Sequence, residues 1–323
     1  MIKLCENKRA ADLTASMIRK GREPHSIIIC GEQGLGKRTI AKVVAAQLLC
    51  EEGSGTPCGK CRSCRLIEKD AHPDFITAKP SDSGNYKTDD IRAIVSDAVI
   101  SPSEGKYKIY LIPDMDRSVQ TLPQLQNVLL KLIEEPPDTA VIILTARSKE
   151  VFLDTIISRT VHLQAEEVAP AAAQAWLIEN GVSAELAEEA VRRCGGNIGQ
   201  CLEYSQNEDL RNIAAIAERA STAIAENNEY ELLTAISECE AKKDSLIKLF
   251  TFMQRIVRDS CRIRAGAEQS RIFSQKVCRS MSMSHSALRL ADLYDILGDF
   301  RHRVSANCSI AMLINALPAK IFS

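Results

Sequence analysis

A glycine-rich segment, Gly31-Glu32-Gln33-Gly34-Leu35-Gly36-Lys37, most constrains the fold of this 323-residue chain. The run Ser26–Cys30 before it is short, apolar and β-branched, which is typical of a buried strand. The segment Lys37–Leu49 after it carries apolar residues at helical spacing. A strand, a glycine loop and a helix in this order are the context of a phosphate-binding loop, where backbone N–H groups and the helix N-terminus hold phosphate. The alternative is a strand–helix turn without a ligand.

We expect the phosphate-loop site to consist of Gly31, Gly34, Gly36, Lys37 and Thr39. In such loops the lysine reaches the terminal phosphates, and the next residue is a Ser or Thr that holds Mg²⁺. This chain has Arg38 in that place. Thr39 follows one place late and points elsewhere, because a helix turns by about 100° per residue. The sequence therefore predicts a loop that can bind phosphate but lacks the hydroxyl group that usually holds Mg²⁺.

A second weakened position lies beyond the predicted strand Tyr107–Ile112. An active nucleotide site has acidic residues at such a strand end, but here the place of the metal-orienting aspartate is Pro113. Asp114 stands where a glutamate would polarise water, and it is one methylene shorter. Because phosphoryl transfer depends on the metal and on positioning, we expect poor or no hydrolysis. Whether ATP or ADP binds stays open.

The order of elements predicts an α/β fold up to about residue 165. Further strand candidates are Asp74–Thr77, Ala140–Thr145 and Thr160–Leu163, and they alternate with helical segments. Such alternation is typical of a parallel sheet covered by helices on both faces. After residue 165 the pattern is helical only, and the break Gly195-Gly196-Asn197 predicts a division between a small and a larger helical unit.

Four of the 12 cysteines, namely Cys50, Cys58, Cys61 and Cys64, fall within 15 residues in the pattern C-x₇-C-x₂-C-x₂-C. Four thiolates at this spacing fit tetrahedral Zn²⁺ and leave no open position, so we expect a structural zinc site. The alternatives are an iron–sulfur cluster and unligated thiols. Cys50 is the least certain ligand, because the seven-residue gap is loose.

Composition excludes several classes of protein. Lys plus Arg is 41 and Asp plus Glu is 42, so a net charge of −1 disfavours a basic nucleic-acid coat. Aromatic residues are 4%, too few for a base-stacking platform. No apolar run approaches the about 20 residues of a membrane span, and we expect a cytoplasmic protein. Residues 241–290 carry 11 Lys or Arg against three acids, which indicates either phosphate contacts or, as we prefer, a solvated helix face.

Three further segments resemble a known family. Asn127–Pro137 (N-V-L-L-K-L-I-E-E-P-P) is similar to a helix end N-x-L-L-K-x-L-E-E-P-P, and Ser158-Arg159-Thr160 is similar to a Ser-Arg-Cys motif. The cysteine cluster lies between the phosphate-loop helix and His72-Pro73-Asp74-Phe75, as in that family. Over about residues 1–205 the chain resembles the δ′ subunits of bacterial DNA polymerase III clamp loaders, which are related to the γ/τ subunits.

The resemblance implies an α/β AAA+ P-loop module in residues 1–165 with an inserted zinc module at 50–64, a helical lid in 166–207 and an all-α collar in 208–323. It also implies partners: γ/τ and δ subunits in a hetero-pentameric ring, the sliding clamp, and primed DNA reached through the assembled complex. Arg159 would then reach in trans to a neighbour's ATP. Its alternative role is a surface arginine with a local partner.

Three hypotheses follow. The first is a stator within the DNA polymerase III holoenzyme, without intrinsic ATPase activity, that supplies Arg159 to a neighbour. In its favour, Gln200 stands where the lid of an active subunit has a phosphate-sensing arginine, and Ala146-Arg147 lacks a water-sensing asparagine. The second is a γ/τ-like ATPase whose metal site is rescued by Thr39 or Asp116. The third, a stand-alone nucleic-acid-binding P-loop protein, is disfavoured by charge and aromatic content.

Overall fold

The computed structural model describes residues 4–81, 84–118, 121–239, 242–266, 273–306 and 308–322. The chain forms two compact units, Met1–Ala172 and Ala173–Ser323, and each is described by itself. The sequence placed the end of the α/β module at residue 165, seven residues before this division. The difference arises because the chain after the last strand, up to the start of a helix at Pro170, packs with the first unit.

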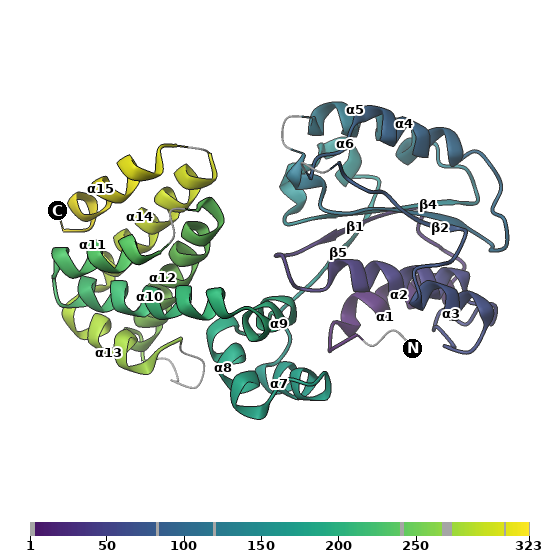
Figure 1. The fold of residues 1–323 in the computed structure, drawn as a ribbon. Coiled ribbons are helices and arrows are strands. Elements are labelled where there is room, and N and C mark those ends of the chain that lie inside the picture. Colours follow the sequence, from purple (N-terminus) through teal and green to yellow (C-terminus); the bar gives the residue numbers. More distant parts are fainter. Residues whose placement is uncertain are drawn as a thin grey trace. The chain divides into compact units, whose positions relative to one another are not determined.

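The first unit is built on a parallel five-stranded sheet with the strand order β2-β3-β4-β1-β5 (Figure 1). The strands are β1 Ser26–Cys30, β2 Phe75–Thr77, β3 Lys108–Ile112, β4 Ala140–Ala146 and β5 Val161–Gln164. The three longest strand segments, β1, β3 and β4, are buried along their whole length. Burial on both faces explains their continuous apolar sequences, which a one-sided sheet would not require. The predicted fold class is confirmed.

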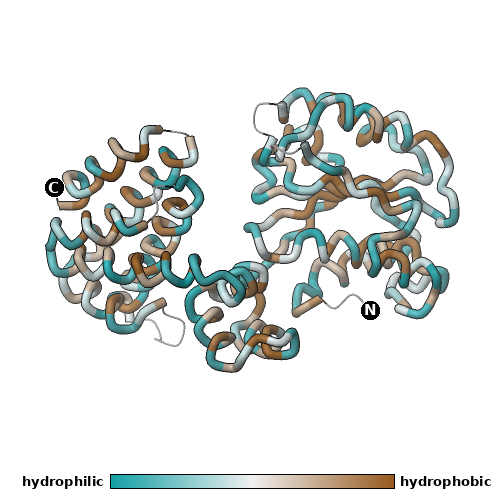
Figure 2. Tube along the Cα trace, viewed as in Figure 1, coloured by the Kyte–Doolittle hydropathy of each residue, from teal (hydrophilic) through white to brown (hydrophobic). Residues whose placement is uncertain are grey.

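Helices cover both faces of this sheet. They are α1 Lys8–Arg19, α2 Lys37–Leu49, α3 Arg62–Glu68, α4 Thr88–Asp97, α5 Leu122–Glu134 and α6 Asp154–Ile157, with short 3₁₀ turns η1 Met115–Arg117 and η2 Lys149–Val151. Helices α1, α2 and α3 share one apolar core with one face, and α4, α5 and α6 share a second core with the other (Figure 1). Figure 2 shows the strands as the apolar centre of the unit. The two cores hold the strand ends, and hence the loops that follow them, in place.

The second unit is helical throughout its described residues. Its helices are α7 Pro170–Glu179 (which starts in the first unit), α8 Ala184–Cys194, α9 Ile198–Gln206, α10 Glu208–Ala225, α11 Glu229–Glu238, α12 Lys243–Arg264, α13 Gln275–Ser284, α14 Ala287–Ser305 and α15 Ile310–Ile321. Several begin at an Asn or Ser whose side chain accepts an N–H of the first turn, as at Asn197, Asn207 and Asn228.

One expectation for this region is wrong. The break Gly195-Gly196-Asn197 does not divide two helical units, because it is the turn between α8 and α9, which pack on each other. Gly195 ends α8 with a φ of 69°, and Asn197 caps α9. Glycine and asparagine therefore act here as the end and the start of two neighbouring helices. Five helices were not predicted: α3, α6, α9, α13 and α15.

Candidate functional site

The glycine loop follows β1, which lies between β4 and β5 in the sheet. The N–H of Gly31 donates to the carbonyl oxygens of Ala146 and Arg147 at 3.2 and 3.1 Å. Its φ is +146°, and a Cβ at this position would lie 2.7 Å from the carbonyl oxygen of Ala165. Gly36 has a φ of +78° and stands at the N-cap of α2. The loop therefore has the backbone that the sequence predicted, and glycine at position 31 is needed for space as well as conformation.

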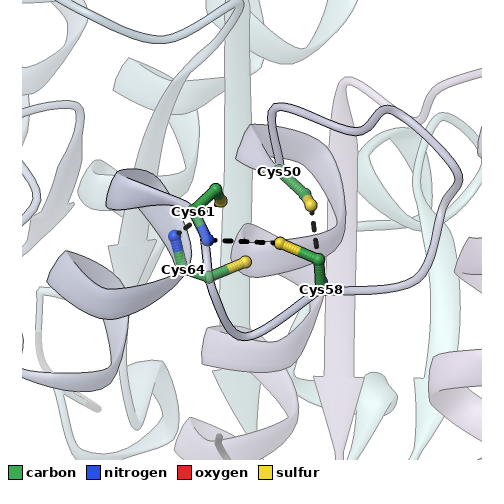
Figure 3. Close-up of side chains that lie close together, drawn as sticks. All are labelled: Cys50, Cys58, Cys61 and Cys64. Carbon is green, nitrogen blue, oxygen red and sulfur yellow. Dashed lines mark hydrogen bonds between the residues drawn. The ribbon is translucent and has the colours of Figure 1, made fainter.

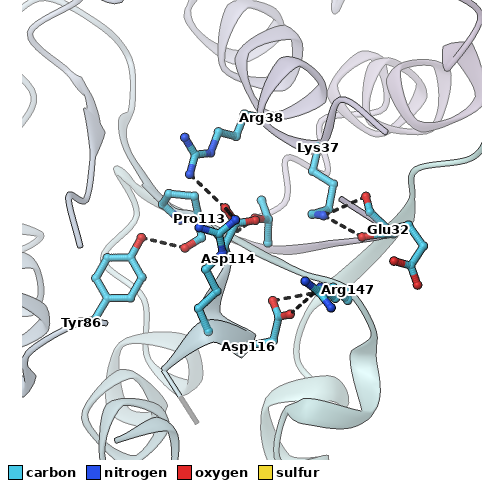
Figure 4. Close-up of polar contacts among 11 residues, drawn as sticks. Glu32, Lys37, Arg38, Tyr86, Pro113, Asp114, Asp116 and Arg147 are labelled. Carbon is cyan, nitrogen blue, oxygen red and sulfur yellow. Dashed lines mark hydrogen bonds and ion pairs between the residues drawn. The ribbon is translucent and has the colours of Figure 1, made fainter. Parts of the chain in front are cut away.

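Lys37 is the first residue of α2, and its side chain is buried. Its Nζ donates to the carbonyl oxygens of Gly31 at 2.6 Å and Glu32 at 3.1 Å (Figure 4). Burial lowers the pKa of this ammonium, although the nearby Asp114 and Asp116 oppose the shift. The lysine thus spans its own loop, in the position from which it could contact a phosphate.

The main difference from an active nucleotide site lies at Arg38. Its guanidinium lies 2.9 Å from the carboxylate of Asp114, which is the second residue after β3 and stands in the place of the polarising glutamate (Figure 4). Asp114 has a φ of +52°, and its N–H donates to Thr145 Oγ1 at 2.8 Å. Thr39 is partly buried on α2. The structure thus brings together, as a pair, two residues that the sequence had marked separately.

A second arginine–carboxylate pair lies beside the first. Arg147, which follows β4, has its Nε 3.6 Å from Asp116, and its own N–H donates to the same carboxylate at 3.3 Å (Figure 4). The carbonyl oxygen of Pro113 accepts the hydroxyl of Tyr86 at 2.7 Å. The carboxylates of Asp114 and Asp116 therefore have arginine side chains as partners. Sequence reasoning missed both pairs, because no local signal links positions so distant in the chain.

The four cysteines of the predicted metal site lie together at the end of α2 and the start of α3 (Figure 3). Their sulfur atoms are all within 4.8 Å of one another. Backbone N–H groups point at the sulfurs: Cys58 donates to Cys50 Sγ at 3.4 Å, Cys61 to Cys58 Sγ at 3.3 Å, and Cys64 to Cys61 Sγ at 3.4 Å. Such donors stabilise thiolates, so the set fits a metal ion with four sulfur ligands. Cys50 belongs to the cluster despite its loose spacing.

The thiols differ in their acidity without a metal. Burial works against ionisation of Cys61, but the N–H of Cys64 and other donors lower the pKa of its thiol to about 7. Burial raises the pKa of Cys64. The cluster thus combines an easily ionised thiol at the rim with a buried one beneath it.

A buried carboxylate fixes the loop beside the cysteine cluster. Asp74, fully buried before β2, accepts the N–H groups of Ser103, Glu104 and Gly105 at 2.6, 2.8 and 2.7 Å. Arg62 of α3 pairs with Glu104 at 2.9 Å. The histidine of the same segment, His72, accepts the N–H of Asp74 at 3.1 Å, as a turn residue would. The cluster is thereby tied to the edge of the sheet.

Arg159 lies just after α6, at the surface of the first unit. Its Nη2 is 3.5 Å from Glu134 Oε1 at the end of α5, and its Nη1 donates to the carbonyl oxygen of Thr155 at 3.2 Å. The side chain is 46% exposed, so it stays accessible from outside the chain. The local partner that the sequence analysis offered as the alternative is present. An exposed arginine can exchange such a partner for another anion.

In the second unit, Gln200 lies in the first turn of α9, and its Oε1 accepts a hydrogen bond from Arg255 of α12. Arg255 also donates to the carbonyl oxygen of Arg193 at 2.9 Å. The basic stretch 241–290 bonds within this unit elsewhere too, as Lys248 does to Glu203 and Arg262 to Asp259. Arg271 and Glu268, which the charge count includes, lie outside the described residues. In these cases the basic side chains contact acids or carbonyl groups of the same unit.

Within the described ranges, none of the helices combines the length and the apolar character that a membrane span requires.

Comparison with known proteins gives a consistent result. The family model described as DNA polymerase III, delta subunit, matches residues 6–169. The DNA polymerase III subunit delta′ of Bacillus subtilis is 32% identical over 202 residues, which are 62% of this chain and 60% of that protein. The subunit tau of Escherichia coli is 34% identical over 158 residues, 48% of this chain and 24% of that protein. The chain thus spans about 60% or less of these relatives.

Among solved structures, a DNA polymerase III gamma subunit-related protein from Thermotoga maritima aligns with 97% of this chain and 98% of its own. Its sequence identity is 16% and the TM-score is 0.44.

Proposed function

Since this chain belongs to the DNA polymerase III delta subunit family, we propose that it is a δ′-type subunit of a clamp loader. In this role it serves as a stator: it supplies Arg159 to the ATP site of a neighbouring subunit and does not hydrolyse ATP itself. Its partners are γ/τ-type and δ subunits in a hetero-pentameric ring, the sliding clamp, and primed DNA bound by the assembled complex. Relatives named as subunits delta′ and tau support the assignment.

The Arg38–Asp114 pair carries the proposal that this chain's own site is inactive. In an active loop the residue at position 38 would hold Mg²⁺ and the one at 114 would act on water. Here the two side chains bond to each other at 2.9 Å, so a guanidinium engages the carboxylate that would otherwise act on water. Pro113 offers no side-chain ligand. Lys37 keeps the capacity to bind phosphate, but the groups needed for turnover are missing.

The proposed trans role of Arg159 follows from its chemistry and its exposure. A planar guanidinium offered across an interface stabilises negative charge on a transferring phosphate, worth roughly 10³–10⁵ in rate in related cases. The side chain is attached to a short helix at the surface and is half exposed. Among the described residues its polar partners are Glu134, the carbonyl oxygen of Thr155 and Ser158 Oγ.

Two further assignments complete the proposal. We assign the four cysteines to one structural Zn²⁺, because four sulfurs leave no open coordination position. We also divide the helical region into a lid, residues 166–207, and a collar, residues 208–323. The collar would hold the ring together. Its largest helix pair, α12 and α14, is joined by an apolar seam that includes Phe250 and Phe300, whose ring centroids are 6.4 Å apart.

The test is ATP turnover of the complex reconstituted with γ/τ-type and δ subunits, stimulated by clamp and primed DNA. Arg159→Ala in this chain should remove the share of turnover that its neighbour's site contributes. Lys37→Ala should leave turnover unchanged within twofold. Arg22→Ala, which removes another exposed arginine of the first unit, is the matched control.

The opposite pattern would establish the alternative, a γ/τ-like ATPase. In that case Lys37→Ala reduces turnover, Arg159→Ala is no worse than Arg22→Ala, and the isolated chain hydrolyses ATP. Salt-sensitive nanomolar binding of DNA by the isolated chain would instead favour the third hypothesis of the sequence analysis.

A further inference from the structure

The arginine assigned to the trans role is held by two elements of its own chain. Its Nη2 lies 3.5 Å from Glu134 Oε1, on the last residue of α5. Its Nη1 donates to the carbonyl oxygen of Thr155, in α6, at 3.2 Å and to Ser158 Oγ at 3.3 Å. The carbonyl contact with Thr155 and the hydroxyl contact with Ser158 are made to residues within four positions of the arginine. Among the described residues, Glu134 is the one acid that pairs with the guanidinium.

The helix α5, which carries Glu134, is bonded to and packed against the segment that leads to Arg159. The side chain of Gln126, buried in α5, donates to the carbonyl oxygen of Val151 at 3.0 Å and accepts the N–H of Leu153 at 2.6 Å. Ile133 and Ile156, which neighbour the pair along the chain, belong to the same apolar core. Close packing of this kind fixes the backbone positions of both residues. The fold therefore fixes the backbone positions from which the two side chains meet.

Glu134 occupies a place that is unfavourable for an isolated helix. A carboxylate in the last turn faces the negative end of the helix dipole, where cations are preferred. The motif nevertheless has two acids there, Glu134 and Glu135, before Pro136 and Pro137 end the helix. Glu135 is exposed and, among the described residues, is not the carboxylate that pairs with Arg159. The motif singled out from the sequence thus places one specific carboxylate beside the arginine.

We propose that Glu134 restrains Arg159 in the resting chain until phosphate oxygens of a neighbour's ATP replace its carboxylate. The inference rests on the proposed trans role of Arg159 and adds a positioning residue that regulates it. Glu134 neutralises the guanidinium and repels an approaching phosphate, so it opposes engagement of the arginine before the ring closes. Because both side chains are about half exposed, their attraction is weak enough to be exchanged for the stronger pairing with a phosphate.

The experiment is steady-state ATP turnover of the reconstituted clamp loader without clamp or DNA, with kcat and KM measured separately. Glu134→Gln should raise this basal turnover about two- to fivefold and lower KM, the range expected for the loss of one exposed ion pair. Glu134→Asp keeps the charge and should stay near the wild-type rate. The difference in basal turnover between wild type and Glu134→Gln should become smaller as salt rises from about 0.05 to 0.2 M, because salt screens exposed ion pairs.

Glu135→Gln is the matched control, since it relieves the same helix dipole and should leave basal turnover unchanged. In an Arg159→Ala background, Glu134→Gln should have no effect. If Arg159→Ala itself fails to lower stimulated turnover, the proposed function is wrong. If Arg159→Ala lowers it but Glu134→Gln matches Glu135→Gln, or still accelerates turnover without Arg159, the trans role stands and the restraint is wrong. Melting temperatures within about 2 °C of wild type show that each variant is folded.

Discussion

Single arginines set the charge around the phosphate loop. Arg38 and Arg147 each pair with an acid that follows β3, so that the carboxylates of Asp114 and Asp116 already have cationic partners. A metal ion would have to displace these guanidinium groups before it could bind there. In a related ATPase the same positions would hold Mg²⁺ and the attacking water. These two pairs are the physical basis of our proposal that this chain's own nucleotide site is inactive.

Asp74 allows a prediction on the pH dependence of stability. Burial raises the pKa of its carboxyl, but the N–H groups of Ser103, Glu104 and Gly105 outweigh burial and hold the pKa below its usual value. A folded pKa below the unfolded value of about 3.9 means that the ionised carboxylate stabilises the fold above that pH. This contribution is lost as the pH falls from about 5 through the folded pKa.

Asp74→Asn should lower the free energy of unfolding by about 1–3 kcal/mol at pH 7, because one buried acceptor becomes a donor. Urea unfolding measured from pH 7 to pH 3 should show the difference in unfolding free energy between wild type and Asp74→Asn narrowing below about pH 5. Asp138→Asn, at an exposed aspartate, should change stability by less than about 0.5 kcal/mol. A gap that stays constant over this range would attribute the loss to packing and not to charge.

At the scale of elements, the segment from the end of α2 to α3 depends on its cysteines. The loop 51–60 between them has three glycines among its ten residues and no strand or helix of its own. Few apolar contacts can order such a loop, so we expect a bound metal ion to contribute much of its stability. The ion pair Arg62–Glu104 connects α3 to the loop before β3, so an ordered α3 also restrains that loop.

Cys61→Ser should reduce bound zinc from one per chain to a small fraction, as measured by metal analysis of the purified protein. We expect a melting temperature about 5 °C lower, corresponding to roughly 2 kcal/mol for a unit of this size. Cys308→Ser, at an exposed cysteine outside the cluster, should change neither quantity. A chelator should speed hydrogen exchange in residues 50–69 while β3 and β4 stay protected. Unchanged zinc in Cys61→Ser, or iron in place of zinc, would contradict the assignment.

At the scale of the whole molecule, the chain consists of two units with separate cores. Both apolar clusters around the sheet lie within Met1–Ala172. The helices of Ala173–Ser323 bury their own apolar residues, among them Phe250 and Leu293. A unit that has its own core can fold alone.

Fragments 1–172 and 173–323 should therefore each unfold cooperatively on heating. The sum of their far-ultraviolet circular dichroism spectra should match the spectrum of the whole chain within about 10%. A cut placed inside α10, after residue 216, is the matched control and should leave the second fragment without a cooperative transition. Loss of cooperativity in the fragments divided at 172 would show that the units depend on each other.

Local patterns in the sequence determined much of this protein. The strand β1, the glycine loop and α2 were predicted at their observed bounds, because burial and backbone conformation act on residues adjacent in the chain. The short spacing of the four cysteines likewise predicted that their sulfur atoms lie close together, as they do. Prediction failed where the signal was weak, as for the seven-residue helix α3 and the Ser- and Met-rich helix α13. Gly195 was misinterpreted because a helix end and a unit boundary use the same residues.

Only the tertiary structure decided which charges meet. Arg38 and Asp114 are 76 positions apart, and the strand order places β3 and β1 on either side of β4 so that the segments after β1 and β3 come together. Arg159 and Glu134 meet because α5 and α6 share a core. The sequence alone shows that Arg38 stands where an active loop has a hydroxyl group. It does not show that this arginine pairs with Asp114. That pairing depends on distances through space, which the packing of helices on the sheet defines.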